Sequence, residues 1–151
     1  MIKTIKYAKL HSDAIPPFRK NLTDSGVDFC SIEDILIKPH SITIVKTGIS
    51  LEIPEGYMLL IKPKGKNNHL IGAGVVDAFY HPGEILIKVA NISSLPLPIK
   101  KGNAIGQGVF IPIETPELIE VEQSELINNS ERSYTGWIVD QAKVFKKLEG
   151  F

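Results

Sequence analysis

The sequence predicts one all-β domain with little helix, and two observations support that prediction. Short runs rich in Ile and Val recur along the chain, as the pleated and half-buried surface of a sheet favours. Turn-forming residues, such as those at 38–40, 54–56 and 81–83, separate the runs. Short strands with this regular punctuation are typical of sandwiches and barrels. At 151 residues, the chain is long enough to bury roughly 70% of its unfolded surface in a single core.

The strands are expected where these apolar runs lie. Prolines stand mostly at the ends of the runs, where the loss of a backbone N–H does least harm to a sheet. The expected strands cover residues 2–10, 35–38, 41–46, 48–53, 57–62, 84–90, 104–113 and 118–122.

Helical patterns are confined to two places. Residues 31–34 are expected to open a single turn. In the tail, apolar residues near helical spacing predict a short C-terminal helix over residues 137–148. We therefore expect a β domain over residues 1–127 and a C-terminal arm over residues 128–151.

Composition and charge exclude several classes of protein. Lys plus Arg and Asp plus Glu number 17 each, so the formal net charge is zero, which argues against a nucleic-acid partner. No apolar run approaches the roughly 20 residues that span a bilayer, so no membrane partner is expected. The N-terminal residues carry charges where a secretory segment would be apolar. We expect a cytoplasmic location.

Two glycine-containing segments carry charges that suit Mg²⁺ or phosphate. Asp24 and Asp28 bracket Gly26. One such carboxylate can hold hydrated Mg²⁺ together with substrate phosphates, although a plain turn before a strand explains the same pattern. The basic segment 63–69 follows an expected strand, and its ammonium and N–H groups suit phosphate. The alternative there is a solvated basic hairpin.

The most informative segment surrounds Asp77, which follows an apolar run and precedes aromatic residues and a turn. A carboxylate at the end of a buried strand must be hydrogen-bonded or lie solvated in a cleft. Such a carboxylate can orient and deprotonate a water molecule. Tyr80 can place its ring against a sugar, whereas His81, beside a Pro-Gly turn, is interpreted as a surface residue.

Two further segments offer phosphate or base contacts. Gln107 lies in an apolar strand between two glycines, which often mark a close approach by a ligand or another backbone. It either donates to a phosphate oxygen or forms part of a strand bulge. In the segment 130–137, Arg132 can clamp a phosphate and Trp137 can stack on a base; ordinary loop packing is the alternative.

The order of these segments resembles that of the five motifs in the trimeric dUTPase family (dUTP diphosphatases), phage members especially. The resemblance covers about residues 20–137. The family's motifs have the forms A-G-x-D, P-R-S, G-x-I-D-x-D-Y-x-G-E, G-x-x-I-A-Q and R-G-x-x-G-F-G-S-T-G. The matching segments are Ser25-Gly-Val-Asp28, Pro63-Lys-Gly-Lys66, Gly74-Val-Val-Asp-Ala-Phe-Tyr-His-Pro-Gly-Glu84, Gly102-Asn-Ala-Ile-Gly-Gln107 and Arg132-Ser-Tyr-Thr-Gly-Trp137.

The resemblance implies a distorted jelly-roll or β-barrel-like fold and Mg²⁺-dependent hydrolysis of dUTP to dUMP and pyrophosphate. It implies that Asp77 activates the water that attacks the α-phosphorus, that Asp28 holds Mg²⁺ through water, and that three chains of a homotrimer share each site. It further implies that the phosphates are contacted by Lys64, Gly65, Lys66 and Gln107. The backbone at Ile71, Val75 and Val76 would contact the uracil edge, and Tyr80 would contact the deoxyribose. Arg132 and Trp137 would come from the arm of a neighbouring subunit.

Several departures from the family motifs keep two alternatives open. In the second motif, Lys64 replaces the Arg and Gly65 replaces the Ser. Phe79 replaces the second Asp of the third motif, and Trp137 replaces the Phe of the fifth motif. Lys lacks the fork that binds phosphate bidentately. One alternative is therefore a non-catalytic homotrimer that binds a nucleotide or a protein. The other is a relative of the dCTP deaminases, whose catalytic Glu position is occupied here by Lys88.

Overall fold

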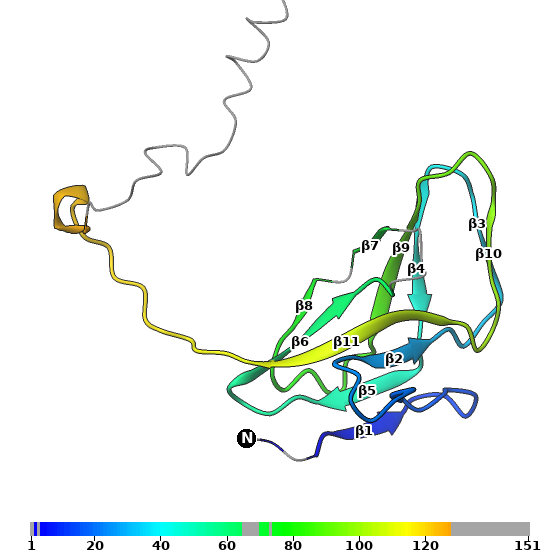
Figure 1. The fold of residues 1–151 in the computed structure, drawn as a ribbon, viewed down its shortest axis with the longest axis horizontal. Coiled ribbons are helices and arrows are strands. Elements are labelled where there is room, and N and C mark those ends of the chain that lie inside the picture. The colour runs from blue at the N-terminus through cyan, green and yellow to red at the C-terminus, as the bar shows by residue number, and fades with distance from the viewer. Residues whose placement is uncertain (1, 3, 65–69, 73, 128–151) are drawn as a thin grey trace, which may run out of the picture. The chain divides into compact units, whose positions relative to one another are not determined.

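The structure, a computed structural model, describes residues 2, 4–64, 70–72 and 74–127 (Figure 1). Strands dominate these residues, and the all-β prediction is confirmed. The elements are β1 (Lys6–Lys9), β2 (Val27–Cys30), β3 (Ile35–Ile37), β4 (Ser41–Lys46), β5 (Ile49–Glu52), β6 (Tyr57–Lys62), β7 (Leu70–Gly72), β8 (Val75–Val76), β9 (Leu86–Asn91), β10 (Leu97–Ile99), β11 (Ala104–Pro112) and the 3₁₀ helix η1 (Gln123–Glu125).

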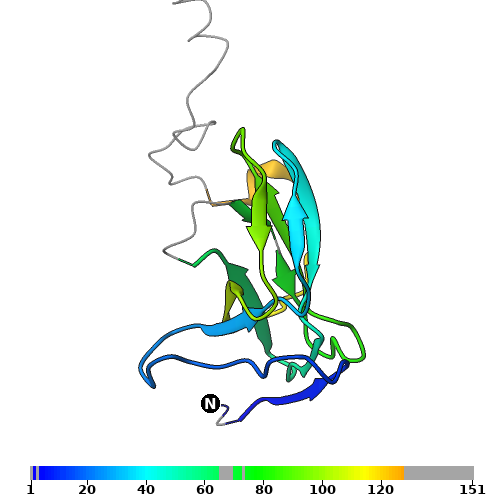
Figure 2. The same ribbon diagram turned by 90° about the vertical axis from the view of Figure 1, so that its right-hand side faces the viewer.

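The strands form two larger sheets and two two-stranded ribbons. The larger sheets have the orders β2-β11-β6-β8 and β4-β9-β7, and the ribbons are β1-β5 and β3-β10. All of these pairs are antiparallel. Figures 1 and 2 show β3 and β10 side by side along their whole length. This arrangement of short antiparallel strands is the kind that the sequence predicts.

One hydrophobic core joins the two larger sheets. Phe29 and Leu59 of the four-stranded sheet belong to the same buried cluster as Val45 and Ile87 of the three-stranded sheet. Along β9, buried and more exposed residues alternate, as expected for a strand with one face on the core. The two sheets therefore pack against each other through their apolar faces.

The strands at 41–46 and 57–62 begin and end where the sequence predicts, but two other expectations are wrong. Residues 118–122 form no strand, because no described strand pairs with them, and Leu118 is 93% exposed. Residues 31–34 form no helical turn. Instead, Ser31 Oγ donates to Glu33 O (2.7 Å) and accepts from Glu33 N (3.3 Å), a local alternative to helix.

Four described strands lie outside the expected runs, β2, β7, β8 and β10, although a turn before a strand is one interpretation of the segment that precedes β2. In β2, Asp28 interrupts the apolar run, and in β10, Pro98 lowers the strand preference of a three-residue segment. β10 pairs with β3 alone, so it is an edge strand, where a proline is tolerated. β2 and β10 form because a distant segment, β11 for β2 and β3 for β10, supplies the backbone hydrogen bonds, which the local sequence does not reveal.

The chain divides into two compact units, residues Met1–Thr115 and Pro116–Phe151. The first contains every strand found among the described residues. Within the described part of the second, η1 begins with a capping box in which Glu122 and Glu125 each accept the other's backbone N–H. The predicted division at residue 127 remains a prediction, and the predicted helix over 137–148 lies outside the described residues. In the part of the chain that is described, no helix is long and apolar enough to cross a membrane.

Candidate active site

Three predicted site residues meet at one end of the four-stranded sheet: Asp28, Lys64 and Gln107, called here the Asp28 cluster. Gln107 on β11 lies directly opposite Asp28 on β2 and opposite Lys62 on β6. Lys64 follows β6 by two residues, and its Nζ donates to Asp28 Oδ2 at 2.5 Å. The cluster therefore combines segments that resemble the first, second and fourth family motifs.

Asp28 is the rigid member of this cluster. On one side β2 pairs with β11, and on the other side Asp28 N donates to Phe18 O at 2.7 Å. The Asp28 side chain is 13% exposed and that of Lys64 is 31% exposed. The ion pair is thus partly shielded from water, where a charge–charge contact is stronger than on an open surface.

Gln107 is positioned by two features of its surroundings. Its Nε2 donates to Pro63 O at 2.9 Å, which leaves a second N–H on the same amide nitrogen. A β-bulge interrupts the register between Ala104 and Gly106, just before Gln107. Gly26 lies so close that a Cβ there would stand 2.7 Å from Gln107 Oε1. The predicted bulge and hydrogen-bonded Gln are both present.

Asp77 lies elsewhere, in the turn of residues 77–84 that follows β8. It is exposed, and it comes directly after Val76, which is buried. The turn is held by Phe79, whose φ is +57° and whose N–H donates to Ile53 O at 3.0 Å. A non-glycine residue at positive φ is uncommon and is often found at functional sites. The carboxylate is thus presented to solvent from a fixed backbone.

Tyr80 packs within the same turn. Its hydroxyl donates to Glu84 O at 2.7 Å, and Gly83 N donates to Tyr80 O at 2.8 Å. The ring lies over Gly83, where a Cβ would come within 2.9 Å of the ring atoms. Glycine at position 83 is therefore required for this orientation of the ring, which is half-buried.

The end of the turn is anchored to β5 and the residue before it. Glu84 Oε1 accepts a hydrogen bond from Gly48 N at 2.8 Å, and His81 Nδ1 lies 2.8 Å from Ser50 Oγ. Ser50 is buried, whereas His81 is exposed, as expected for a surface residue. These contacts fix the turn that carries Asp77 and Tyr80 from both ends.

The Asp77 turn and the Asp28 cluster lie at opposite corners of the four-stranded sheet. Val76 pairs with Leu59 near one end of β6, whereas Gln107 pairs with Lys62 at the other. β2 and β8 are the two edge strands. Strand spacing and rise place Asp28 and Asp77 on the order of 15–20 Å apart. The two groups of one chain therefore cannot contact the same phosphorus atom.

The expected base-reading hairpin is built from two strands that join different sheets. β7, which contains Ile71, pairs with β9, and β8 pairs with β6. Gly74, at φ +61°, lies between them. Val75 is exposed, whereas the Val76 side chain points into the core, so only its backbone can face a ligand. The other predicted site residues, Gly65, Lys66, Arg132 and Trp137, lie outside the described residues.

The described residues do not fit a metal site built by the chain alone. Nowhere in the described ranges do three or more His, Cys, Asp or Glu side chains lie close enough to hold one ion. Asp28, the predicted Mg²⁺ contact, is paired with Lys64. The nearby Asp24 accepts hydrogen bonds from Asn21 N (2.9 Å) and Asn21 Nδ2 (3.3 Å), and these contacts hold the pKa of Asp24 below its usual value.

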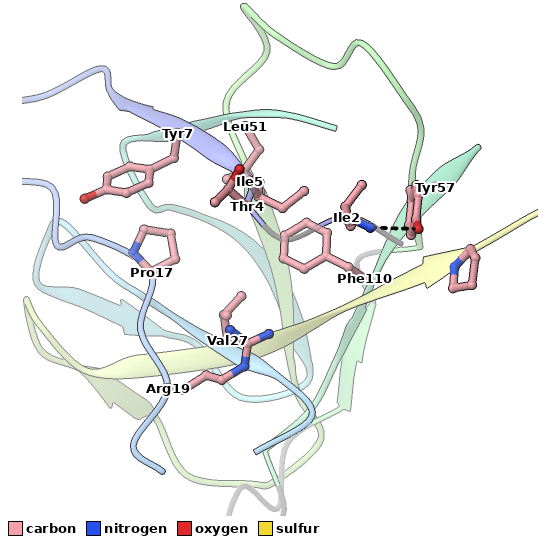
Figure 3. A pocket seen from close by; sticks show the side chains of 11 residues that line it. Ile2, Thr4, Ile5, Tyr7, Pro17, Arg19, Val27, Leu51, Tyr57 and Phe110 are labelled. Carbon is pink, nitrogen blue, oxygen red and sulfur yellow. Dashed lines mark hydrogen bonds between the residues drawn. The ribbon is translucent and has the colours of Figure 1, made fainter. Parts of the chain in front are cut away.

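A cavity of about 520 Å³ has a lining of its own, although Val27 in this lining precedes Asp28 and Arg19 Nε donates to Asp24 O at 2.9 Å (Figure 3). Figure 3 shows Ile5 and Tyr7 of the N-terminal segment along the upper side of the view, with Phe110, Pro17 and Val27 below them, and Ile2 N donating to Tyr57 Oη at 3.3 Å. Its lining is mostly apolar and includes none of the predicted site residues. We therefore do not assign the chemistry to this cavity.

Fold and site together define an all-β protein in which the exposed carboxylate of Asp77 lies on a turn, separated from the Asp28 cluster. The dUTPase family model matches residues 12–137. The deoxyuridine 5'-triphosphate nucleotidohydrolase of Helicobacter pylori (strain Shi470) is 37% identical over 125 residues, which are 79% of this chain and 86% of that protein. The chain therefore belongs to the dUTPase family, as the order of motifs predicts.

Solved structures of phage dUTPases have the same fold. The Staphylococcus bacteriophage 80alpha dUTPase with dUPNHPP has a TM-score of 0.77 and 27% identity, and the match covers 91% of this chain and all of that one. That dUTPase is described as controlling the transfer of virulence genes by a G protein-like mechanism. A mutant dUTPase from phage phi11 of S. aureus, described with a structural Mg(II) ion, has a TM-score of 0.76, 28% identity and coverage of 82% and 100%.

Proposed function

We propose that this chain is a dUTP diphosphatase that hydrolyses dUTP to dUMP and pyrophosphate. The observation that carries the proposal is the family match over residues 12–137, which spans the Asp77 turn and the Asp28 cluster. The H. pylori relative, whose name states this activity, supports it. Enzymatic hydrolysis is thus favoured over deamination, and Lys88 at the catalytic Glu position of the deaminases agrees with that choice.

In the proposed reaction, Asp77 accepts a proton from a water molecule whose oxygen attacks the α-phosphorus. The bond between the α-phosphorus and the bridging oxygen breaks, and pyrophosphate leaves with the bonding electron pair. The exposed carboxylate on a fixed turn suits a general base, which must reach a bound water. Tyr80 would pack on the deoxyribose, and the backbone at Ile71, Val75 and Val76 would read the uracil edge.

Lys64 and Gln107 would bind the phosphates, together with Gly65 and Lys66. The Lys64 ammonium carries three donors, one of which is used by Asp28, and Gln107 Nε2 has a second N–H. Mg²⁺ would arrive on the triphosphate, since Mg²⁺ retains water readily and often binds through substrate phosphates. When bound, it would neutralise phosphate charge.

We propose a homotrimer in which different chains supply the two halves of each site. The 15–20 Å between Asp28 and Asp77, estimated from strand geometry, is the main support, because one nucleotide cannot bring both groups of a single chain to its α-phosphate. Leu118 and Ile119 are exposed after β11, and burial against a second copy would remove them from water. Arg132 and Trp137 would come from a neighbour's arm.

We propose a cytoplasmic location. The single Cys of the sequence, Cys30, is buried and unpaired, which suits a reducing compartment. Burial raises the pKa of the Cys30 thiol, and the charge of Asp28 raises it further. The thiol therefore stays neutral at physiological pH and serves as a small core residue.

A second candidate function is the binding of a protein partner. The 80alpha dUTPase, which shares this fold at 27% identity, is described as controlling gene transfer by a G protein-like mechanism. In this chain Phe79 replaces the second Asp of the third motif and is 69% exposed beside Asp77. An exposed aromatic side chain of this kind is a common anchor in protein interfaces.

The proposed activity is tested by measuring pyrophosphate release from dUTP, with dCTP and UTP as matched substrates and Mg²⁺ present. We expect rapid release from dUTP and at least about 100-fold slower release from the other two, because buried groups that recognise one base edge are left unpaired by another. Binding of a non-hydrolysable dUTP analogue without turnover would instead support the non-catalytic alternative. Ammonia release from dCTP would support the deaminase alternative.

Replacing Gly26 by Ala should lower the catalytic efficiency toward dUTP without unfolding the protein. The new methyl group would stand 2.7 Å from Gln107 Oε1, and the mobile end of that side chain must then move. Loss of one hydrogen bond to a charged phosphate costs roughly 10- to 100-fold in kcat/KM. Steady-state kinetics check this expectation. Gln107→Ala should show a similar loss, and the double variant little more; fully multiplicative effects would contradict the assigned contact.

A further inference from the structure

We propose that Asp28 is a positioning residue for Lys64 and not a ligand of Mg²⁺. Asp28 would hold the Lys64 ammonium at the end of β6, so that its two remaining N–H donors face the phosphates of the nucleotide. The inference rests on the proposed function and deepens it, because it assigns the metal to the substrate and gives Asp28 a different role.

The contact itself is the first support. Lys64 Nζ donates to Asp28 Oδ2, and both side chains are partly buried, with exposures of 31% and 13%. This differs from Lys6 and Glu52, whose ion pair is 3.5 Å long with side chains 81% and 61% exposed. A partly shielded pair between groups of this kind holds its geometry, whereas a fully exposed one contributes little.

The backbone around Asp28 is the second support. The residue lies within β2, which pairs with β11 through the Asp28–Gln107 register, and Phe18 pairs with it from the opposite side. Because β2 is hydrogen-bonded on both sides, the backbone that carries the Asp28 carboxylate is held in place. Lys64 lies beyond the end of β6 on a flexible four-carbon side chain, so it gains most from such a partner.

The chemistry of the second motif explains why this chain needs the contact. An Arg at this position has a planar fork that orients itself on phosphate, whereas Lys64 is a compact point charge without preferred direction. An ion pair supplies the missing orientation. It also places the positive charge of the Lys64 ammonium at Asp28 Oδ2, where it repels a second cation. The same carboxylate is thus poorly suited to hold Mg²⁺.

The test is a double-mutant cycle with Asp28→Asn, Lys64→Met and the double variant. Calorimetry of the full-length protein measures the affinity for dUMP and for a non-hydrolysable α,β-imido dUTP analogue, both with saturating Mg²⁺. The ratio of the two affinities isolates the terminal phosphates. Unchanged dUMP affinity shows that each variant is folded.

We expect Asp28→Asn to weaken analogue binding about 10-fold and Lys64→Met about 100-fold, with dUMP binding unchanged. Lys64→Met also leaves an unpaired carboxylate beside the phosphates, so the double variant should bind the analogue more tightly than Lys64→Met alone. Asp13→Asn, which removes an exposed carboxylate paired with Lys101, should leave the ratio unchanged.

Two results would overturn the inference. One is a double variant whose loss of analogue affinity equals the product of the losses in Asp28→Asn and Lys64→Met, because the two side chains would then act independently. The other concerns the Mg²⁺ concentration that gives half-maximal turnover. If this concentration rises strongly in Asp28→Asn but not in Lys64→Met, the metal would be assigned to Asp28. Failure of the wild-type chain to hydrolyse dUTP, with the coupled binding pattern intact, would contradict the proposed function and leave this inference standing.

Discussion

Replacing Asp77 by Asn should reduce the turnover of dUTP by about 10²- to 10⁴-fold, the range that general-base catalysis contributes. The amide has nearly the same size as the carboxylate, but it cannot accept a proton from the attacking water. Because Asp77 is exposed on a turn whose backbone is fixed by Phe79 and Glu84, the substitution should not disturb the fold. The rate of pyrophosphate release under saturating dUTP measures the effect directly.

The matched control is Asp13→Asn, which makes the same chemical change at an exposed carboxylate paired with Lys101 at 2.7 Å. It should retain wild-type turnover. Asp77→Asn should still bind the non-hydrolysable dUTP analogue with nearly unchanged affinity, since the carboxylate acts on the water and not on the nucleotide. Normal turnover by Asp77→Asn would show that another group accepts the proton.

The sequence predicts the strands best where the local pattern and the final environment agree. The segments 41–46 and 57–62 are rich in Ile, Val or Leu, pair along their whole length with β9 and β11, and form β4 and β6 with the predicted bounds. The segment 118–122 has an equally strong pattern but forms no strand, because a strand requires a partner and none of the described strands supplies one. Local preference is therefore necessary but not sufficient.

The candidate site could be predicted as a list of residues but not as an arrangement. The motif order leads to Asp28, Lys64, Asp77 and Gln107, and the family match supports the choice of segments. The Asp28–Lys64 contact joins residues 36 positions apart, and no spacing in the sequence indicates it. Likewise, the separation of Asp77 from Gln107 depends on the strand order, which follows from long-range pairing.

Gly108→Ala should destabilise the protein by about 2–3 kcal/mol, within the usual range for overpacking a core. Gly108 lies in β11, where an added Cβ would stand 2.5 Å from Leu59 Cδ1 and 2.8 Å from Phe29 Cε2. Both of those side chains are buried, so neither can move aside without displacing others. In an open strand, the same change would instead stabilise by about 0.5–1 kcal/mol. A decrease in the free energy of unfolding therefore indicates that Leu59 and Phe29 pack closely on Gly108, whereas an increase would indicate an open strand.

Gly106→Ala is the matched control, because Gly106 lies two residues away in the same strand. Its added Cβ would meet Ile87 Cδ1 at 3.1 Å and Ile61 Cγ2 at 3.5 Å, so a displacement of a few tenths of an ångström relieves the contact and the loss should stay within about 1 kcal/mol. Urea unfolding of both variants at one protein concentration gives the comparison, since the stability of an oligomer depends on concentration. Equal losses would contradict the close packing of Phe29 and Leu59 on Gly108. Because Gln107 lies between the two glycines, a shift of β11 in Gly108→Ala should also lower dUTP turnover, which links this strand's packing to the phosphate end of the site.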